Sequence, residues 1–223
     1  MRVAALFSGG KDSNYAVFWA QHQGWEVDHL VTVYSENMES YMYQVPGVEI
    51  TEWSSKAIGI SHIKVRTSGI KERELEPLEN TLGALEIDGI VSGALRSEYQ
   101  RRRIDQICEN LGIKSFAPMW HKNPDKILRE MIEEGWEVVV AAVSAYGLDE
   151  SYIGRRLDLG LMDELMTLRA SYEINIDGEG GEFETIVLYG PTYKKRVVIT
   201  DHKVIWEGSS GYMRILGAEL TSA

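Results

Sequence analysis

The chain has 223 residues, 44% of them hydrophobic and 26% charged, which allows one large domain or a domain with a smaller companion. The formal net charge of −11 argues against direct binding to nucleic acid, since general binding of that kind needs clustered positive charge. The single cysteine, Cys108, excludes an intrachain disulfide and a zinc site built from cysteines, and no apolar run approaches the length of a membrane span. We therefore expect a soluble, cytoplasmic protein without a membrane partner.

The first half of the chain alternates strand-like apolar runs with helical patterns. Helices are predicted at about residues 12–22, from Pro77 onward, and from a capping box formed by Ser97 and Gln100 to Gly112, whereas residues 35–52 look irregular. Strands are predicted at residues 2–7, 27–34, 62–66, 89–95 and 113–117. Because parallel strands need crossover connections, this alternation indicates a parallel sheet with helices on both faces.

A different pattern begins after Pro118. Asn123 and Pro124 start a predicted helix that ends near Glu134, and an apolar stripe predicts a second helix further on. The stripe consists of Ile153, Leu157, Leu161, Leu165 and Leu168. Strands are predicted at residues 138–143, 183–189, 196–200, 204–206 and 212–216. We therefore expect an α/β domain at residues 1–122, followed by a smaller α+β domain at residues 123–223.

The segment at residues 8–13 reads Ser-Gly-Gly-Lys-Asp-Ser and joins the first predicted strand to the first predicted helix. Backbone N–H groups at a helix start attract anions, Gly9 and Gly10 let a phosphate approach the backbone, and Lys11 adds a full positive charge. The segment is not a Walker A loop, because Asp12 follows the lysine where that motif has Ser or Thr. Such an acid suits a residue that holds Mg²⁺ or orients the loop. The alternative is an ordinary strand-to-helix turn capped by Asp12. The residues expected to bind a nucleotide are Ser8, Gly9, Gly10, Lys11, Asp12 and Ser13.

The same string resembles the PP-loop motif of the ATP pyrophosphatases, whose family pattern is Ser-Gly-Gly-x-Asp-Ser. The resemblance implies a five-stranded parallel sheet of the adenine nucleotide α-hydrolase type, which is Rossmann-like, with residues 1–122 as the ATP-binding domain. It also implies ATP and Mg²⁺ as cofactors, with Lys11 and Asp12 in catalysis. A substrate oxygen would attack the α-phosphate to give an adenylate and pyrophosphate, and a nucleophile would then displace AMP. In open α/β sheets ligands bind beyond the carboxyl ends of the strands, which makes Tyr34, Gly93, Ala94 and Leu95 candidates to contact adenine.

Two further segments extend the resemblance along nearly the whole chain. Residues 92–103 read Ser-Gly-Ala-Leu-Arg-Ser-Glu-Tyr-Gln-Arg-Arg-Arg, and residues 178–185 read Gly-Glu-Gly-Gly-Glu-Phe-Glu-Thr. Together with the PP-loop they resemble the diphthine–ammonia ligase family, which typically has tyrosine at the position of Phe183. The resemblance implies ATP-dependent amidation of diphthine, a modified histidine on translation elongation factor two, to diphthamide. The chain has no room for a glutaminase domain, so we expect the nitrogen to come from free ammonia or a partner.

Diphthine carries a carboxylate that must be activated and a trimethylammonium group that must be tolerated. Glutamates of the second segment could attract a cation or an ammonium donor, and aromatic rings could offer a cation–π surface. Without the resemblance, the segment reads as a glycine turn that leads exposed acids into an edge strand. The residues expected to bind the substrate, mainly from residues 123–223, are Tyr99, Trp120, Glu179, Gly180, Gly181, Glu182, Glu184 and Thr185.

Arg96 and Arg103 are the remaining residues that we expect to act in catalysis, by neutralising pyrophosphate or the substrate carboxylate. Arg101 and Arg102 are expected to face solvent, and the alternative for the whole run is a solvated basic helix face paired with Asp105 and Glu109. Two other functions stay open at this point: a PP-loop ligase that acts on another substrate such as RNA, and an ATP-binding sensor without turnover. The sequence leaves the oligomeric state open, a homo-oligomer included.

Overall fold

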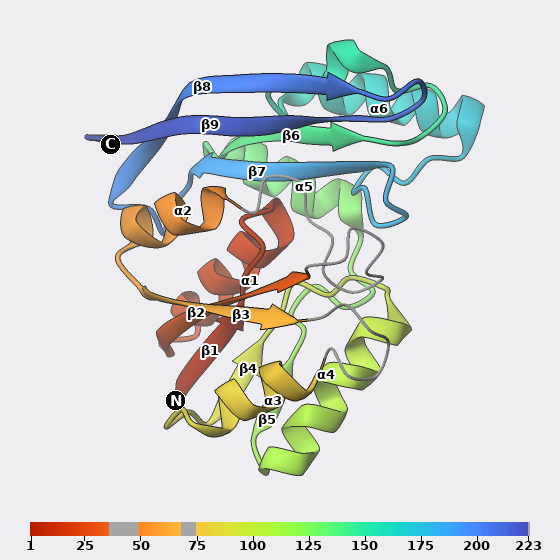
Figure 1. Ribbon diagram of the computed structural model, residues 1–223. Helices are drawn as coiled ribbons and strands as arrows, with labels where there is room; N and C mark the ends of the chain where they lie inside the picture. Colours follow the sequence, from red (N-terminus) through yellow and green to blue (C-terminus); the bar gives the residue numbers. More distant parts are fainter. Residues whose placement is uncertain (36–48, 68–74, 223) are drawn as a thin grey trace.

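The computed structural model describes residues 1–35, 49–67 and 75–222, and it consists of two sheets stacked with helices between them (Figure 1). The sequence-predicted irregular stretch at residues 35–52 falls mostly outside these ranges. Among the described helices, none is both long enough and apolar enough to cross a membrane.

The first sheet is the five-stranded parallel sheet that the sequence predicted. Its strands are β1 (Arg2–Leu6), β2 (Glu26–Ser35), β3 (Ser61–Thr67), β4 (Gly89–Val91) and β5 (Lys114–Phe116). They lie in the order β3-β2-β1-β4-β5, and every pairing is parallel. The chain leaves central β1 toward β2 and β3 and then crosses back to β4. The carboxyl ends of β1 and β4 therefore form the switch point at which such sheets bind ligands.

Helices α1 (Lys11–His22), α2 (Ile50–Ile58), α3 (Glu76–Gly83) and α4 (Glu98–Leu111) cover this sheet. Successive side chains of a strand point to opposite faces. Val3, Ala5 and Phe7 accordingly pack into the core beneath α1 and α2, whereas Ala4 packs into a second core with side chains of α3 and α4. The buried thiol of Cys108 belongs to that second core.

The second sheet is antiparallel and lies beyond α1 and α2 (Figure 1). Its strands are β6 (Glu137–Val143), β7 (Phe183–Tyr189), β8 (Lys195–Trp206) and β9 (Gly211–Ser222), in the order β7-β6-β9-β8. Helix α5 (Pro124–Glu133), the short 3-10 helix η1 (Glu150–Tyr152) and helix α6 (Leu159–Tyr172) accompany it. One continuous hydrophobic core joins the inner faces of both sheets through α1, α2 and α5. The division into domains at residue 122 stays a prediction.

Four elements, two helices and two strands, differ from the sequence prediction for physical reasons. Helix α2 went undetected because its buried face includes Thr51, Ser54 and Ser55, which dilute the apolar stripe. The stripe that predicted α6 begins too early. Asp158 caps that helix by accepting a hydrogen bond from Leu161 N at 2.8 Å, so the segment before it, including Ile153 and Leu157, lies outside the helix.

Strand β8 is one strand rather than two, because a register irregularity between Ile199 and His202 lets it continue past the polar middle. Strand β4 is shorter than predicted and ends at Val91, which leaves residues 92–97 as a loop at the carboxyl edge of the parallel sheet.

Candidate nucleotide and substrate site

The phosphate loop, residues 8–13, leads from β1 into α1 and is packed between α2 and β7. Gly9 has a φ of +83°, and a Cβ there would lie 2.7 Å from the Ile50 side chain. The Gly9 carbonyl accepts a hydrogen bond from Val187 N at 3.0 Å. A Cβ on Gly10 would lie 3.1 Å from the carbonyl oxygen of Thr185. The backbone conformation and the close neighbours together require glycine at position 9, and they fix the loop against the antiparallel sheet.

Polar side chains hold the phosphate loop from inside. The Ser8 and Ser13 hydroxyls lie 3.2 Å apart. Asn14 Nδ2 donates to the carbonyl oxygens of both loop glycines at 3.0 and 2.9 Å. Asn14 Oδ1 in turn accepts a hydrogen bond from the Tyr193 hydroxyl at 3.0 Å, so a residue after β7 supports the loop. Sequence reasoning missed Asn14 and Tyr193; the only signal was that an amide directly follows the motif.

Lys11 connects the phosphate loop with the second half of the chain. Its side chain is 3% exposed, and Nζ lies 2.8 Å from Asp12 Oδ2 while it also donates to the carbonyl oxygen of Asp177. Its backbone N–H donates to Thr185 Oγ1 at 3.2 Å. Burial lowers the pKa of the Lys11 ammonium, but the carboxylates of Asp12, Asp177 and Glu184 outweigh burial and raise it. Lys11 is therefore a buried, permanently charged group at the start of α1.

The loop between β4 and α4, residues 92–97, lies against the phosphate loop. A Cβ on Gly93 would lie 2.6 Å from the carbonyl carbon of Asp12, so only glycine permits this approach. Ala94 and Leu95 are buried, and the Leu95 carbonyl accepts a hydrogen bond from His121 N at 3.0 Å. The structure thus brings two of the three segments with predicted site residues together at the switch point.

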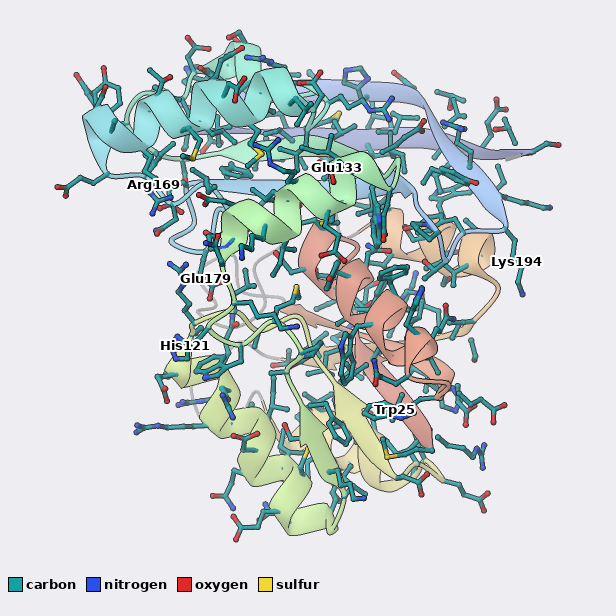
Figure 2. The ribbon with its side chains drawn as sticks, turned by 180° about the vertical axis from the view of Figure 1, so that it is seen from behind. Trp25, His121, Glu133, Arg169, Glu179 and Lys194 are labelled. Atoms are coloured by element: carbon teal, nitrogen blue, oxygen red, sulfur yellow. The ribbon has the colours of Figure 1, made fainter. Side chains whose placement is uncertain are left out.

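The third segment reaches the same place through Glu179. Its Oε1 accepts hydrogen bonds from the backbone N–H groups of Arg96 and Ser97, both at 3.1 Å. The Arg96 guanidinium lies 3.9 Å from Asp177 Oδ2. Figure 2 shows Glu179 where the two halves of the molecule meet, on the same side as His121. Residues that are more than 80 positions apart in the sequence therefore contact one another in one site.

Glu182 supports the Gly178–Glu182 turn rather than the phosphate loop. Its Oε1 accepts hydrogen bonds from Asn175 N at 2.8 Å and from Asn175 Nδ2 at 2.6 Å. The Gly181 carbonyl accepts a hydrogen bond from the Ser144 hydroxyl. Gly180 packs closely against the Glu182 side chain, since a Cβ on Gly180 would lie 2.7 Å from Glu182 Oε1. These contacts give the second glutamate of the segment a role in shaping the turn.

Glu184 lies on β7, where the strand passes the phosphate loop. The β6–β7 ladder is irregular here: Thr185 pairs with Val140 and Glu184 with Ala142, so Ala141 is an extra residue. Such bulges change the direction in which nearby side chains point. Burial raises the pKa of the Glu184 carboxyl to about 7; nearby Lys11 opposes this rise, and the other acids of the site add to it.

The Diphthamide synthase N-terminal domain family matches residues 1–115, and the Diphthamide synthase C-terminal domain family matches residues 123–220. The chain belongs to the diphthine–ammonia ligase (diphthamide synthase) family.

Three relatives of that family are named diphthine–ammonia ligase. The protein from Rattus norvegicus is 32% identical, over 99% of this chain and 92% of its own length. The protein from Homo sapiens is 31% identical, over 95% of this chain and 88% of its own length. The protein from Schizosaccharomyces pombe is 32% identical over 95% of this chain, but the match spans only 38% of that longer protein. The matches to these two mammalian relatives thus extend over nearly the whole of this chain.

Within this member of the diphthine–ammonia ligase family, the predicted aromatic residues are engaged by the protein's own arginines. The Arg103 guanidinium carbon lies 3.4 Å from the ring centre of Tyr99, and that of Arg101 lies 4.3 Å from the ring centre of Trp120. Arg101, which was expected to face solvent, stacks on Trp120 and also lies 3.5 Å from Asp105, the pairing that the alternative interpretation named. One face of each ring is therefore covered, and a role of these rings toward trimethylammonium stays a prediction.

Tyr34 lies near the end of β2, opposite Arg66 of β3, and Lys64 Nζ lies 6.0 Å from its ring centre. This position is at the carboxyl edge of the parallel sheet, as expected for a residue near a bound nucleotide. Contact of Tyr34, Gly93, Ala94 or Leu95 with adenine stays a prediction.

Asp177 is a further site residue that sequence reasoning missed. Its side chain is 4% exposed, its carbonyl receives Lys11, and its Oδ1 accepts a hydrogen bond from Glu179 N at 3.3 Å. The available signal was the Asp177-Gly178 pair, which is typical of a turn directly before the glutamate segment. A turn signal alone does not show that the aspartate is buried.

Enzymes that act on ATP commonly use Mg²⁺, which binds through one or two carboxylates and takes its other ligands from phosphates and water. Among the described residues, no group of three or more His, Cys, Asp or Glu is arranged to hold a metal by itself. Asp12 fits the weaker requirement, because its carboxylate lies at the start of α1 beside Lys11. The family uses ATP, and Asp12 as a ligand of Mg²⁺ stays a prediction.

Proposed function

We propose that this protein is an ATP-dependent ligase that amidates diphthine on translation elongation factor two, with free ammonia as the nitrogen source. One observation carries the proposal: in a chain that matches both domains of the diphthamide synthase family, the glutamate segment at residues 178–185 contacts the phosphate loop directly. Lys11 bonds to Thr185 through its backbone and to the Asp177 carbonyl through its side chain.

The phosphate loop suits the first half of the proposed reaction. The backbone N–H groups at the start of α1 and the charged Lys11 would bind the phosphates of ATP. Arg96, at the neighbouring loop, would neutralise the departing pyrophosphate, and Mg²⁺ held by Asp12 would contribute further positive charge. The diphthine carboxylate oxygen would attack the α-phosphate, so that the bond between the α- and β-phosphates breaks and an acyl adenylate forms.

The second half of the reaction needs an uncharged amine near the adenylate. Ammonia would attack the acyl carbon, AMP would leave with the electron pair of the broken carbon–oxygen bond, and one proton would be lost from nitrogen. Glu184 is the side chain best suited to take a proton from ammonium. It lies near Lys11 and Asp12, and its carboxyl has a pKa of about 7, so it can exchange a proton near neutral pH. Tyr99 and Trp120 would border the space for the protein substrate.

The test is to incubate the protein with ATP, Mg²⁺, ammonium and an elongation factor that carries diphthine. We expect equal release of AMP and pyrophosphate, together with a decrease of about 1 Da in the mass of the factor, as hydroxyl is replaced by amine. Release of ADP and phosphate would contradict the proposal. Amidation of an RNA in place of the factor would identify a ligase with another substrate, and ATP binding without turnover would identify a sensor.

Lys11→Ala tests the site in this assay, because it removes the buried ammonium group and keeps the backbone N–H that donates to Thr185. We expect it to lower pyrophosphate release on the order of a hundredfold or more, as is typical when a group that stabilises transition-state charge is lost. Glu207→Ala, in the exposed turn after β8, should retain wild-type turnover.

A further inference from the structure

Glu179 makes an unusual pair of contacts for a residue expected to bind substrate. A single oxygen, Oε1, accepts hydrogen bonds from two consecutive backbone N–H groups, those of Arg96 and Ser97, both at 3.1 Å. Ser97 is the N-cap of α4, and its own hydroxyl accepts from Gln100 N at 3.4 Å. The carboxylate of Glu179 therefore holds the two residues that lead into α4, and it lies near the start of that helix, where the dipole favours negative charge.

The neighbours of Glu179 attach the same short segment to the phosphate loop. Asp177 Oδ1 accepts a hydrogen bond from Glu179 N at 3.3 Å, and the Asp177 carbonyl accepts one from Lys11 Nζ. The Asp177 carboxylate also lies 3.9 Å from the Arg96 guanidinium. Residues 177–179 thus contact both Lys11 and the β4–α4 loop, which are the two elements with expected phosphate-binding cations.

We infer that Glu179 is a positioning residue that fixes the β4–α4 loop, and with it Arg96, relative to Lys11, and that it does not itself bind diphthine. The inference rests on the proposed function, since it assigns Glu179 to the adenylation half of that reaction. Charge-stabilising groups act only if they are held in place before the reaction, and a displacement of about 1 Å can cost about a hundredfold in rate. Glu179 restrains the Arg96 backbone directly, so its loss would release that group.

The contact geometry allows the positioning role of Glu179 to be tested separately from the role of its charge. Both N–H groups donate to one oxygen, and the side-chain carbonyl of glutamine can supply that oxygen without a charge. Glu179→Gln should therefore preserve the loop, whereas Glu179→Ala should release it. A residue that bound a cationic group of the substrate would need its charge, and both variants would then fail alike.

The experiment compares wild type, Glu179→Gln, Glu179→Ala and Glu98→Ala, with Glu98→Ala as a control for loss of an acid from the first turn of α4. Adenylation is measured as exchange of labelled pyrophosphate into ATP, with the diphthine-bearing factor present and ammonium omitted. Hydrogen exchange of the Arg96 and Ser97 amides is followed in the ligand-free protein. Thermal unfolding of each variant shows whether it is folded.

We expect Glu179→Ala to lower kcat for pyrophosphate exchange about a hundredfold and to accelerate exchange of the two amides about tenfold or more. Glu179→Gln should stay within about threefold of wild type in both measurements, a margin below about 1 kcal/mol, and Glu98→Ala should match wild type. Equal loss of turnover in the Gln and Ala variants, or unchanged amide exchange in Glu179→Ala, would overturn the inference. If wild type showed no pyrophosphate exchange, the proposed function would fail, and the amide measurement would still decide the role of Glu179.

Discussion

Glu184 offers a direct test of the electrostatics of the site in the ligand-free protein. Its carboxyl lies on β7 beside the phosphate loop, and burial raises its pKa to about 7 from an ordinary value of 4.5. Lys11 opposes the rise, whereas Asp12 and Glu179 add to it. The folded protein therefore holds a proton on Glu184 at pH values where the unfolded chain has already lost it.

The difference between the pKa of Glu184 in the folded protein and its ordinary value sets the size of the effect on stability. At about 1.36 kcal/mol per pH unit, it corresponds to about 3 kcal/mol of folding free energy. Because the folded pKa is raised, Glu184 costs the folded state nothing at a pH below 4.5. The cost grows as the pH rises from 4.5 to 7, and it is fully present above pH 7. Glu184→Gln removes the ionisable proton and keeps the shape of the side chain.

The assay is urea or thermal unfolding of wild type and Glu184→Gln at pH 5 and at pH 8. We expect the variant to be more stable by about 3 kcal/mol at pH 8, or by roughly 6–12 °C in Tm for a chain of this size. At pH 5 the gain should fall below about 1 kcal/mol. Glu207→Gln, which changes an exposed acid in the turn after β8, should change stability little at either pH.

The same gain at both pH values would show that the amide stabilises by packing, and it would refute the electrostatic explanation. A lower stability of Glu184→Gln at pH 8 would show instead that the ionised carboxylate is favourable in the folded state. In that case the attraction of Lys11 would exceed the cost of burial.

Three further predictions concern packing, one hydrogen bond and the buried thiol. Gly93→Ala should weaken ATP binding about tenfold or more, measured by calorimetry, because its Cβ would lie 2.6 Å from the Asp12 carbonyl carbon; unchanged affinity would mean that the two loops separate freely. Thr185→Val removes the acceptor of the Lys11 N–H and should lower the free energy of unfolding by about 1–3 kcal/mol, whereas Thr185→Ser should restore most of it in urea unfolding. Burial raises the pKa of Cys108 to about 11, so the thiol of the native protein should resist iodoacetamide at pH 8 and react after denaturation. Mass spectrometry of the labelled protein measures this difference, and rapid labelling of the native protein would contradict the burial of Cys108.

Much of the fold was predictable because its signals are local. The alternation of apolar runs and helix caps was sufficient for the parallel sheet, and the Ser97 and Asn123 caps lie where their side chains predicted them. Helix α2 was not predictable in this way, because polar residues fill its buried face. The start of the apolar stripe before α6 was equally misleading, since the partly buried Ile153 and the buried Leu157 pack against the core from outside any α-helix.

The site was predictable in its parts but not in its assembly. The phosphate loop could be recognised because glycines and a lysine follow a strand, a purely local pattern. Asp177 could not be recognised, because its carbonyl oxygen accepts a hydrogen bond from Lys11, which lies 166 positions away in the sequence. Glu179 and Glu182 look equivalent in the sequence, yet Glu179 holds the loop before α4 and Glu182 stabilises its own turn. Only the folded arrangement separates their roles.

The contact between Lys11 and Thr185 also has a consequence for synthesis of the chain. The two residues are 174 positions apart, so the ribosome completes the motif at residues 8–13 long before its partner strand exists. Domains generally fold as they emerge, beginning at the N-terminus. The parallel sheet can therefore form early, while its phosphate loop still lacks Thr185, Val187 and Tyr193. A nascent chain of this enzyme should remain unable to hold ATP in its final geometry until β7 has left the ribosome.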